Sequence, residues 1–173
     1  MSYTFKLFST GAVRKTPKKV IYTMLASVAG SYEIIVEIGA GKGELTNVLQ
    51  GHLQFNQYYA FEIDEKACEK LKKEFPSIVV QKADAFHFYN YLPESKKIDL
   101  FLSSIPLSFY SAKKVRELLN VAKGLLNNDG KIVIIFTAFW LTWFFKKILP
   151  GSRITSFLTF PPYFILVYQK KQL

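Results

Sequence analysis

The sequence predicts an α/β fold in which a mostly parallel sheet is closed by an antiparallel hairpin. Up to residue 136, short apolar segments rich in β-forming residues alternate with segments of helical periodicity. Such alternation is typical of βαβ units, which build a parallel sheet. After residue 136 two apolar segments flank Pro161-Pro162, as expected for a hairpin at the edge of a sheet. Five strands and this hairpin would form a seven-stranded sheet.

The individual elements follow from the same patterns. The predicted strands, in chain order, are Ile34–Ile38, Tyr58–Ile63, Ile78–Val80, Leu100–Ser103 and Lys131–Phe136. The predicted helices are Glu44–Leu49, Glu65–Phe75 and Ala112–Leu126. The third helix has apolar residues at the 3.6-residue spacing of one buried face, and we expect Asn127–Gly130 to end it.

The length of the chain fits one domain. With 173 residues, of which 50% are hydrophobic, the sequence can build a single substantial core. We therefore predict that residues 1–173 form one domain without an internal linker. Within it, residues 1–30 form a basic N-terminal segment, and residues 138–150 form an aromatic and basic insertion after the fifth strand.

The charge of the chain is unevenly distributed. The net charge is +10, yet all 13 acidic residues lie between Glu33 and Asp129, so that both ends are purely basic. Clustered positive charge suits a polyanionic partner, either nucleic acid or an anionic membrane surface. A solvated basic face without any partner explains the charge alone equally well.

Several classes of site and location are disfavoured by the composition. A single cysteine, Cys68, allows neither an internal disulfide nor a Cys/His metal cluster, so we predict no metal site. The N-terminus lacks the pattern of a secretory signal. The longest apolar stretch, Ile132–Phe145, has 14 residues, fewer than a membrane-spanning helix needs. We therefore expect a cytoplasmic protein without a transmembrane helix.

A glycine-rich turn follows the first predicted strand in the segment IIVEIGAGKGELT, residues 34–46. Gly39, Gly41 and Gly43 allow the backbone to approach a ligand at the carboxyl end of the strand. Their G-x-G-x-G spacing differs from the dinucleotide fingerprint, and Glu37 would repel a phosphate but suits the cationic methionine moiety of S-adenosylmethionine. The turn therefore favours S-adenosylmethionine as the cofactor, although a structural glycine turn without a ligand is the alternative.

Acidic residues also follow the second and third strands. Glu62 can accept hydrogen bonds from ribose hydroxyls, with Ile63 beside it, whereas Asp64 matches the N-cap of the following helix. Asp84 can accept from an adenine amino group and Ala85 can donate its backbone N–H, although Asp84 also fits an ordinary cap or turn. Acids at three successive strand ends are much less expected by chance than any one of them.

The fourth strand carries the most specific segment, IDLFLSSIPLSFY, residues 98–110. Ser104-Ile105-Pro106-Leu107 stands in the place of the Asn-Leu-Pro-Tyr-type motif of amino methyltransferases such as rRNA adenine dimethylases, with serine instead of asparagine. The chain resembles the bacterial phospholipid N-methyltransferases, which are class I S-adenosylmethionine-dependent methyltransferases with a Rossmann-like fold. The segments that carry this resemblance are TGAV (10–13) with Thr16-Pro17, EIGAGKGELT (37–46), AFEID (60–64), KADAF (82–86), SSIPLSFY (103–110) and PPYFILVY (161–168).

This resemblance implies methylation of phosphatidylethanolamine to its mono-, di- and trimethylated forms. It makes Ser104, Pro106 and Tyr110 the candidate catalytic residues and adds Ser103 to the cofactor-binding candidates. Tyr110 stands where the family usually has proline, which leaves the exact lipid open. His87 is a candidate proton relay, although we expect it to be a partly buried loop residue. An rRNA adenine N6-methyltransferase-like enzyme and an N-methyltransferase of another aminolipid, such as ornithine lipid, are the alternatives.

Two segments have the composition of a membrane interface, with aromatic residues beside lysines. The first combines Phe5 and Phe8 with basic residues, and the second combines the tryptophans of the insertion with the lysines that follow. An ordinary core flap is the alternative for the insertion. We expect peripheral association with an anionic membrane through Lys6, Arg14, Lys15, Lys18, Lys19, Trp140, Trp143, Lys146 and Lys147.

Overall fold

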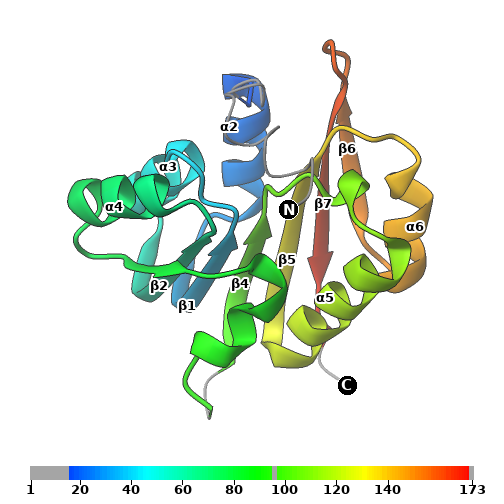
Figure 1. The fold of residues 1–173 in the computed structure, drawn as a ribbon. Coiled ribbons are helices and arrows are strands. Elements are labelled where there is room, and N and C mark those ends of the chain that lie inside the picture. Colours follow the sequence, from blue (N-terminus) through cyan, green and yellow to red (C-terminus); the bar gives the residue numbers. More distant parts are fainter. Residues whose placement is uncertain (1–15, 95–96, 172–173) are drawn as a thin grey trace.

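A seven-stranded sheet with helices on both faces forms the centre of the computed structural model, which describes residues 16–94 and 97–171 (Figure 1). The strands lie in the order β3-β2-β1-β4-β5-β7-β6. The first five pair in parallel, whereas β7 pairs antiparallel with both β5 and β6. The predicted fold class, a mostly parallel seven-stranded sheet closed by an antiparallel hairpin, is confirmed.

The elements have the following bounds. The strands are β1 (Ser31–Ile38), β2 (Gln54–Glu62), β3 (Val79–Lys82), β4 (Ile98–Ser103), β5 (Leu126–Phe136), β6 (Arg153–Phe157) and β7 (Tyr163–Gln169). The α-helices are α2 (Lys18–Ser27), α3 (Glu44–His52), α4 (Glu65–Glu74), α5 (Ala112–Leu125) and α6 (Leu141–Ile148). Two short 3₁₀ helices, η1 (Ala85–Tyr91) and η2 (Leu107–Phe109), follow β3 and β4.

The hydrophobic pattern located each of the first five strands but missed the amino ends of most of them. For example, β2 begins at Gln54, four residues before the predicted start, because three of its first four residues are polar and none of the four is buried, yet they pair with β1 through their backbone. The end of α5 was also wrong by one residue. Leu126 is buried but pairs with Ile98 as the first residue of β5. Burial marks a core position, and it does not distinguish a helix from a strand.

Two helices were not predicted. α2 lies in the segment that we had described only as basic, and its Val20, Ile21 and Met24 are buried. α6 lies in the aromatic insertion, where Leu141 and Phe145 are buried. Both segments therefore contain amphipathic helices that pack on the core. In the part of the chain that the structure describes, no helix has the length and hydropathy to cross a membrane.

The sheet separates two hydrophobic cores. α2, α3 and α4 pack on one face, and η1, α5 and α6 pack on the other. Successive strand residues alternate between these cores: Ile35 contributes to the first and Val36 to the second. Because β1 to β5 are parallel, all five end at one edge of the sheet, which we call the carboxyl edge. The loops that follow these strands are therefore neighbours in space.

Gly43 allows α3 to start in close contact with α4. It has φ +84°, and a Cβ atom at this position would lie 2.6 Å from Phe75 Cε2 and 2.9 Å from Leu71 Cδ2. Both the backbone conformation and the space therefore require glycine.

We expect Gly43→Ala to destabilise the protein by about 1–3 kcal/mol, because it combines an unfavourable φ with overpacking. Gly124→Ala is the matched control, since Gly124 lies within α5 and a Cβ there would meet no atom within 4 Å. This control should be neutral or stabilising by up to about 1 kcal/mol, as alanine has the higher helix propensity. Thermal or chemical unfolding measures both, and equal stabilities for the two variants would contradict this explanation.

Candidate active site at the carboxyl edge of the sheet

The glycine-rich turn between β1 and α3 lies beside the end of β2. Gly39, Gly41 and Gly43 all have positive φ, at +78°, +55° and +84°. The backbone N–H groups of Gly39 and Ala40 donate to Phe61 O at 2.8 and 3.1 Å. The turn therefore has a conformation that glycine favours, and it is anchored to the neighbouring strand.

The loop after β4 packs directly on this turn. A Cβ atom at Gly39 would lie 2.3 Å from Ile105 Cγ2, so only glycine fits. Ser104 Oγ donates to Gly39 O at 2.9 Å, and Ser104 N donates to Ile38 O at 3.3 Å. The predicted catalytic segment and the predicted cofactor turn are thus held together. Ser104 uses its only hydroxyl proton for this contact, and its oxygen keeps the ability to accept a hydrogen bond.

Glu62, the last residue of β2, connects to the same turn. Its Oε2 accepts from Gly41 N at 2.8 Å, and its Oε1 accepts from Ile63 N at 2.7 Å and from Asp64 N at 2.9 Å. A carboxylate offers about four acceptor positions, so about one remains for a further donor. Binding both hydroxyls of a ribose would therefore require Glu62 to release one backbone amide.

The aspartates that follow β2 and β3 both cap helices. Asp64 Oδ1 accepts from Ala67 N at 2.8 Å at the start of α4, which confirms its predicted structural role. Asp84 Oδ1 accepts from Phe86 N at 3.0 Å and caps η1, which Ala85 begins. The cap that we gave as the alternative for Asp84 is present. Its contact with adenine, and that of Ala85, stays a prediction.

Glu37 lies beneath the turn and is fully buried. Its Oε2 accepts from Thr46 Oγ1 at 2.7 Å and from Tyr58 OH at 2.6 Å, which ties β1 to α3 and β2. Burial raises the pKa of Glu37, an effect that the hydrogen bonds from Tyr58 and Thr46 oppose and that the charge of Glu62 increases. Glu37 Oε1 has no hydrogen-bond partner among the described residues, and the predicted contact of Glu37 with the cofactor stays a prediction.

Ser103 and Ile63 occupy contrasting environments. Ser103 is buried at the end of β4, and its Oγ has no hydrogen-bond partner among the described residues. Ile63 is 47% exposed directly after Glu62. An exposed apolar side chain at a strand end is suited to contact a flat apolar ring such as adenine.

Tyr110 lies close to the acids of the neighbouring loops. Its ring centroid is 4.7 Å from that of Phe86, and Lys114 Nζ lies 6.0 Å from the Tyr110 centroid. Burial raises the pKa of the Tyr110 phenol, as do the negative charges of Asp84 and Glu62. The phenol therefore stays protonated at neutral pH. Residues that follow β2, β3 and β4 are thus brought together, as the sequence predicted.

The remaining predicted positions differ in their surroundings. His87 is exposed within η1, so the expectation of a partly buried loop histidine was wrong. Pro106 forms the N-cap of η2 beside Ser104. Lys6, Arg14 and Lys15 lie outside the described residues. No group of three or more potential metal ligands occurs among residues 16–94 and 97–171.

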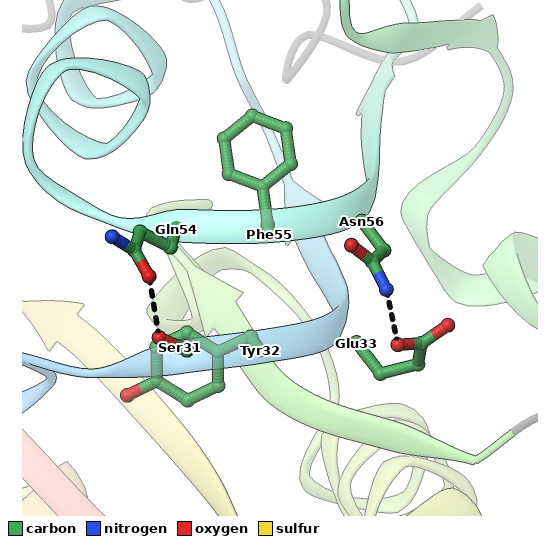
Figure 2. Close-up of a pocket in the computed structure, with 6 residues that line it drawn as sticks. All are labelled: Ser31, Tyr32, Glu33, Gln54, Phe55 and Asn56. Atoms are coloured by element: carbon green, nitrogen blue, oxygen red, sulfur yellow. Dashed lines mark hydrogen bonds between the residues drawn. The ribbon is translucent and has the colours of Figure 1, made fainter.

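A hollow of about 320 Å³ lies at the opposite edge of the sheet (Figure 2). It is lined by the first residues of β1 and β2, where Ser31 donates to Gln54 and Asn56 donates to Glu33. These residues begin the strands whose carboxyl ends form the site. The hollow is therefore separate from the glycine turn and from the catalytic candidates.

Comparison with known proteins identifies the family. A family model described as a methyltransferase domain matches residues 36–132, which is more than half of the chain. The chain belongs to this methyltransferase family. The matched region runs from the last residues of β1 into β5 and contains the glycine turn, Glu62, Asp84 and Ser104. A search of curated proteins found no match to this methyltransferase.

Solved structures share the fold of the methyltransferase at low sequence identity. The N-methyltransferase NodS from Bradyrhizobium japonicum WM9, in complex with S-adenosyl-L-homocysteine, has a TM-score of 0.76 and 11% identity, covering 99% of this chain and 100% of NodS. An rRNA methylase from Streptococcus thermophilus has a TM-score of 0.68 and 16% identity, covering 91% of this chain and 98% of that protein. These likenesses show the class I methyltransferase fold.

The site fits S-adenosyl-L-methionine, the cofactor of this methyltransferase family. A Cβ atom at Gly41 would approach only Gly39 O, at 3.9 Å, so the backbone here is open to a ligand. Carboxylates at the ends of β2 and β3 suit the ribose hydroxyls and the adenine amino group, and Ile63 offers an apolar contact. The donor set and the shape of the turn agree with this cofactor.

The roles of Glu62 and Asp64 can be separated by mutation. Glu62→Ala should weaken S-adenosylmethionine binding by roughly 100-fold or more, because hydrogen bonds to a charged group contribute about 1.5–3 kcal/mol each. Asp64→Ala is the control: it should lose about 1 kcal/mol of stability with its cap and keep the affinity. Isothermal titration calorimetry measures the affinities. An unchanged affinity in Glu62→Ala would show that the cofactor site is misplaced.

The buried Glu37 should make stability depend on pH. Because its pKa is raised, the native state holds the proton more tightly than the unfolded chain does. Its stabilising contribution is therefore complete below the unfolded pKa and is lost as the pH rises through the native pKa. In Glu37→Gln this loss is absent, so its melting temperature relative to wild type should increase as the pH rises above about 4, the pKa of glutamate in an unfolded chain.

Thermal unfolding at a series of pH values measures this difference. Glu69→Gln, at an exposed position of α4, is the control and should show a difference that stays constant with pH. A constant difference for Glu37→Gln as well would mean that Glu37 is not a buried acid with a raised pKa.

Proposed function

We propose that this methyltransferase transfers methyl groups to the amine of a phospholipid head group at a membrane surface. The proposed reaction converts phosphatidylethanolamine to its mono-, di- and trimethylated forms. The observation that carries the proposal is a set of exposed aromatic side chains on α6 and just before it, at the same edge of the sheet as the site.

α6 has one buried and one exposed side. Leu141 and Phe145 are buried, whereas Trp140 and Trp143 are 61% and 72% exposed. Phe139, just before the helix, is 64% exposed. The core-flap interpretation therefore describes only one side of this insertion. Large aromatic side chains left in solvent by a folded helix are suited to the interfacial region of a bilayer.

Lysines accompany these aromatic residues. Lys146 and Lys147 are exposed on α6, and Lys147 Nζ lies 5.5 Å from the centroid of the Trp143 ring. Such a pair offers an apolar surface and a positive charge together, as expected for contact with anionic lipid.

The position of α6 suits delivery of a lipid head group. β5 ends at Phe136 and is parallel to β4, so the chain between β5 and α6 emerges at the carboxyl edge, as do the glycine turn and Ser104. A membrane in contact with Phe139 and Trp140 would thus lie near the end of β4. This arrangement brings an insoluble substrate to the site without requiring the lipid to leave the bilayer.

The basic residues near the two ends of the chain lie at both edges of the sheet. Lys18 and Lys19 are exposed at the start of α2, which is the end of that helix nearer the carboxyl edge. Lys131 and Lys170 lie at the amino edge instead, where their Nζ atoms donate to Ser27 O at 3.4 Å and Leu126 O at 2.8 Å. Only part of the positive charge is therefore available to an anionic surface near the site.

Bound S-adenosylmethionine supplies a methyl group on a sulfonium sulfur. The amine must be neutral to form the new N–C bond while the S–C bond breaks; after the first and second transfers the methylated ammonium releases a proton, whereas the third transfer gives a quaternary ammonium that has none to release. The protonated Tyr110 is unsuited to act as a base, but it can orient the amine through its hydroxyl and can contact the methylated ammonium through its ring. Ser104 Oγ can accept a hydrogen bond from the amine, and Pro106 shapes the loop. Alignment and exclusion of water are thus the main contributions of these residues.

The substrate can be identified by a labelling experiment. The protein is incubated with S-adenosylmethionine labelled in its methyl group and with one of three acceptors: anionic vesicles containing phosphatidylethanolamine, anionic vesicles containing ornithine lipid, or rRNA. We expect label in mono-, di- and trimethylated phosphatidylethanolamine, resolved by mass spectrometry. Label in rRNA alone would reject the lipid proposal, and label in ornithine lipid alone would reassign the lipid.

A further inference from the structure

The turn between β6 and β7 exposes two apolar side chains almost completely. Leu158 and Phe160 are 103% and 92% exposed. The two donors of Thr159 between them are paired within the turn: Thr159 N donates to Phe157 O at 2.9 Å, and Thr159 Oγ1 donates to Pro161 O at 2.7 Å. This turn thus directs apolar groups outward and pairs polar groups locally, which is what entry into an apolar phase requires.

The turn lies at the carboxyl edge of the sheet. Phe157 pairs with Tyr163 at the closed end of the hairpin, and the adjacent Phe164 pairs with Phe136, the last residue of β5. Figure 1 shows the β6–β7 turn projecting beyond the end of the sheet, in the orange and red part of the chain. The turn therefore faces the same side of the molecule as the glycine turn and the start of α6.

Other exposed apolar residues surround this edge. Phe109 in η2 is 57% exposed, and Phe139 and Trp140 are exposed before α6. α2 packs on the face of the sheet opposite to α6. Its buried residues share a core with Phe157 and Tyr163. The exposed lysines at its start are thus on the opposite side of the hairpin from α6.

We propose that the β6–β7 turn, through Leu158 and Phe160, inserts into the interfacial region of an anionic bilayer and sets the carboxyl edge against it. An anionic lipid surface suits this edge better than a second copy of the chain does. Residues 130–173, which include the turn, contain no acidic residue, and Lys18 and Lys19 are exposed at the start of α2, so the surroundings of the turn are positively charged and two such turns would repel each other. The proposal agrees with the proposed lipid substrate but does not require that the lipid be methylated.

Insertion can be observed with a fluorophore at the turn. Cys68 is the only native cysteine and is buried, so an environment-sensitive label on Leu158→Cys reports on that position. We expect its emission to rise on vesicles of phosphatidylethanolamine and phosphatidylglycerol and to be quenched by spin-labelled lipid. The same label on Val79→Cys should show neither change, since Val79 is exposed on β3 at the far end of the sheet. No response at Leu158→Cys on these vesicles would overturn the proposal.

Charge substitutions test whether the turn contributes to binding. The double variant Leu158→Glu/Phe160→Glu should lose roughly tenfold or more of its partition to these vesicles, because two apolar side chains no longer transfer. Val79→Glu should bind as wild type does. Equal losses in both variants, or a wild-type dimer that only the double variant disrupts, would overturn the proposal in favour of general destabilisation or self-association.

Activity on a dispersed substrate separates this proposal from the proposed function. The double variant should still methylate a short-chain, water-soluble phosphatidylethanolamine at the wild-type rate, because the turn is outside the cofactor site. Wild-type protein that inserts into vesicles but methylates no lipid would reject the proposed function alone. A double variant that is equally impaired on dispersed and bilayer substrate would overturn the insertion role.

Discussion

The site depends on the contact between the glycine turn after β1 and the loop after β4. At Gly39 the backbone lies so close to the Ile105 side chain that a Cβ atom would collide with it, and Ser104 Oγ donates to the carbonyl of the same glycine. The predicted cofactor turn and the predicted catalytic segment are therefore one packed unit. Glu62 extends this unit to β2 by accepting from Gly41 N. Side chains from the ends of β2 and β4 thus hold the backbone of the glycine turn in place.

Beneath this surface, a buried acid joins three elements. Glu37 accepts from Thr46 and Tyr58, and its other oxygen has no hydrogen-bond partner among the described residues. An unsatisfied buried oxygen costs about 1–3 kcal/mol, so a purely structural cluster would be better served by apolar residues. The arrangement fixes the start of α3 against the end of β1, which is where the glycine turn must hold its shape. The Glu37 cluster therefore lowers the stability of the protein but fixes the conformation of the glycine turn.

The parallel strands place several properties of the chain at one edge. Four segments that are distant in sequence lie at the carboxyl edge of the sheet. They are the cofactor candidates, the loop after β4, the start of α6 and the β6–β7 turn. α2 and α6 pack on opposite faces, and each keeps a polar or aromatic side in solvent. Because the exposed apolar side chains and the glycine turn lie at the same edge of the sheet, the protein is suited to a methyl acceptor that lies in a membrane surface. This coincidence links the proposed lipid substrate to the proposed insertion of the turn.

The sequence by itself determined the fold class, the five parallel strands, the glycine turn and the family of methyltransferases, because strand periodicity and positive-φ glycines are local properties. It also predicted the capping role of Asp64, which the structure confirms. Only the tertiary structure decided that Glu37 lies beneath the turn, that His87 is exposed and that the lysines at positions 131 and 170 lie at the amino edge. It also showed that Leu158 and Phe160 are exposed, since an apolar residue in a hairpin can equally be buried. Burial and orientation depend on which elements pack together, and no local pattern contains that information.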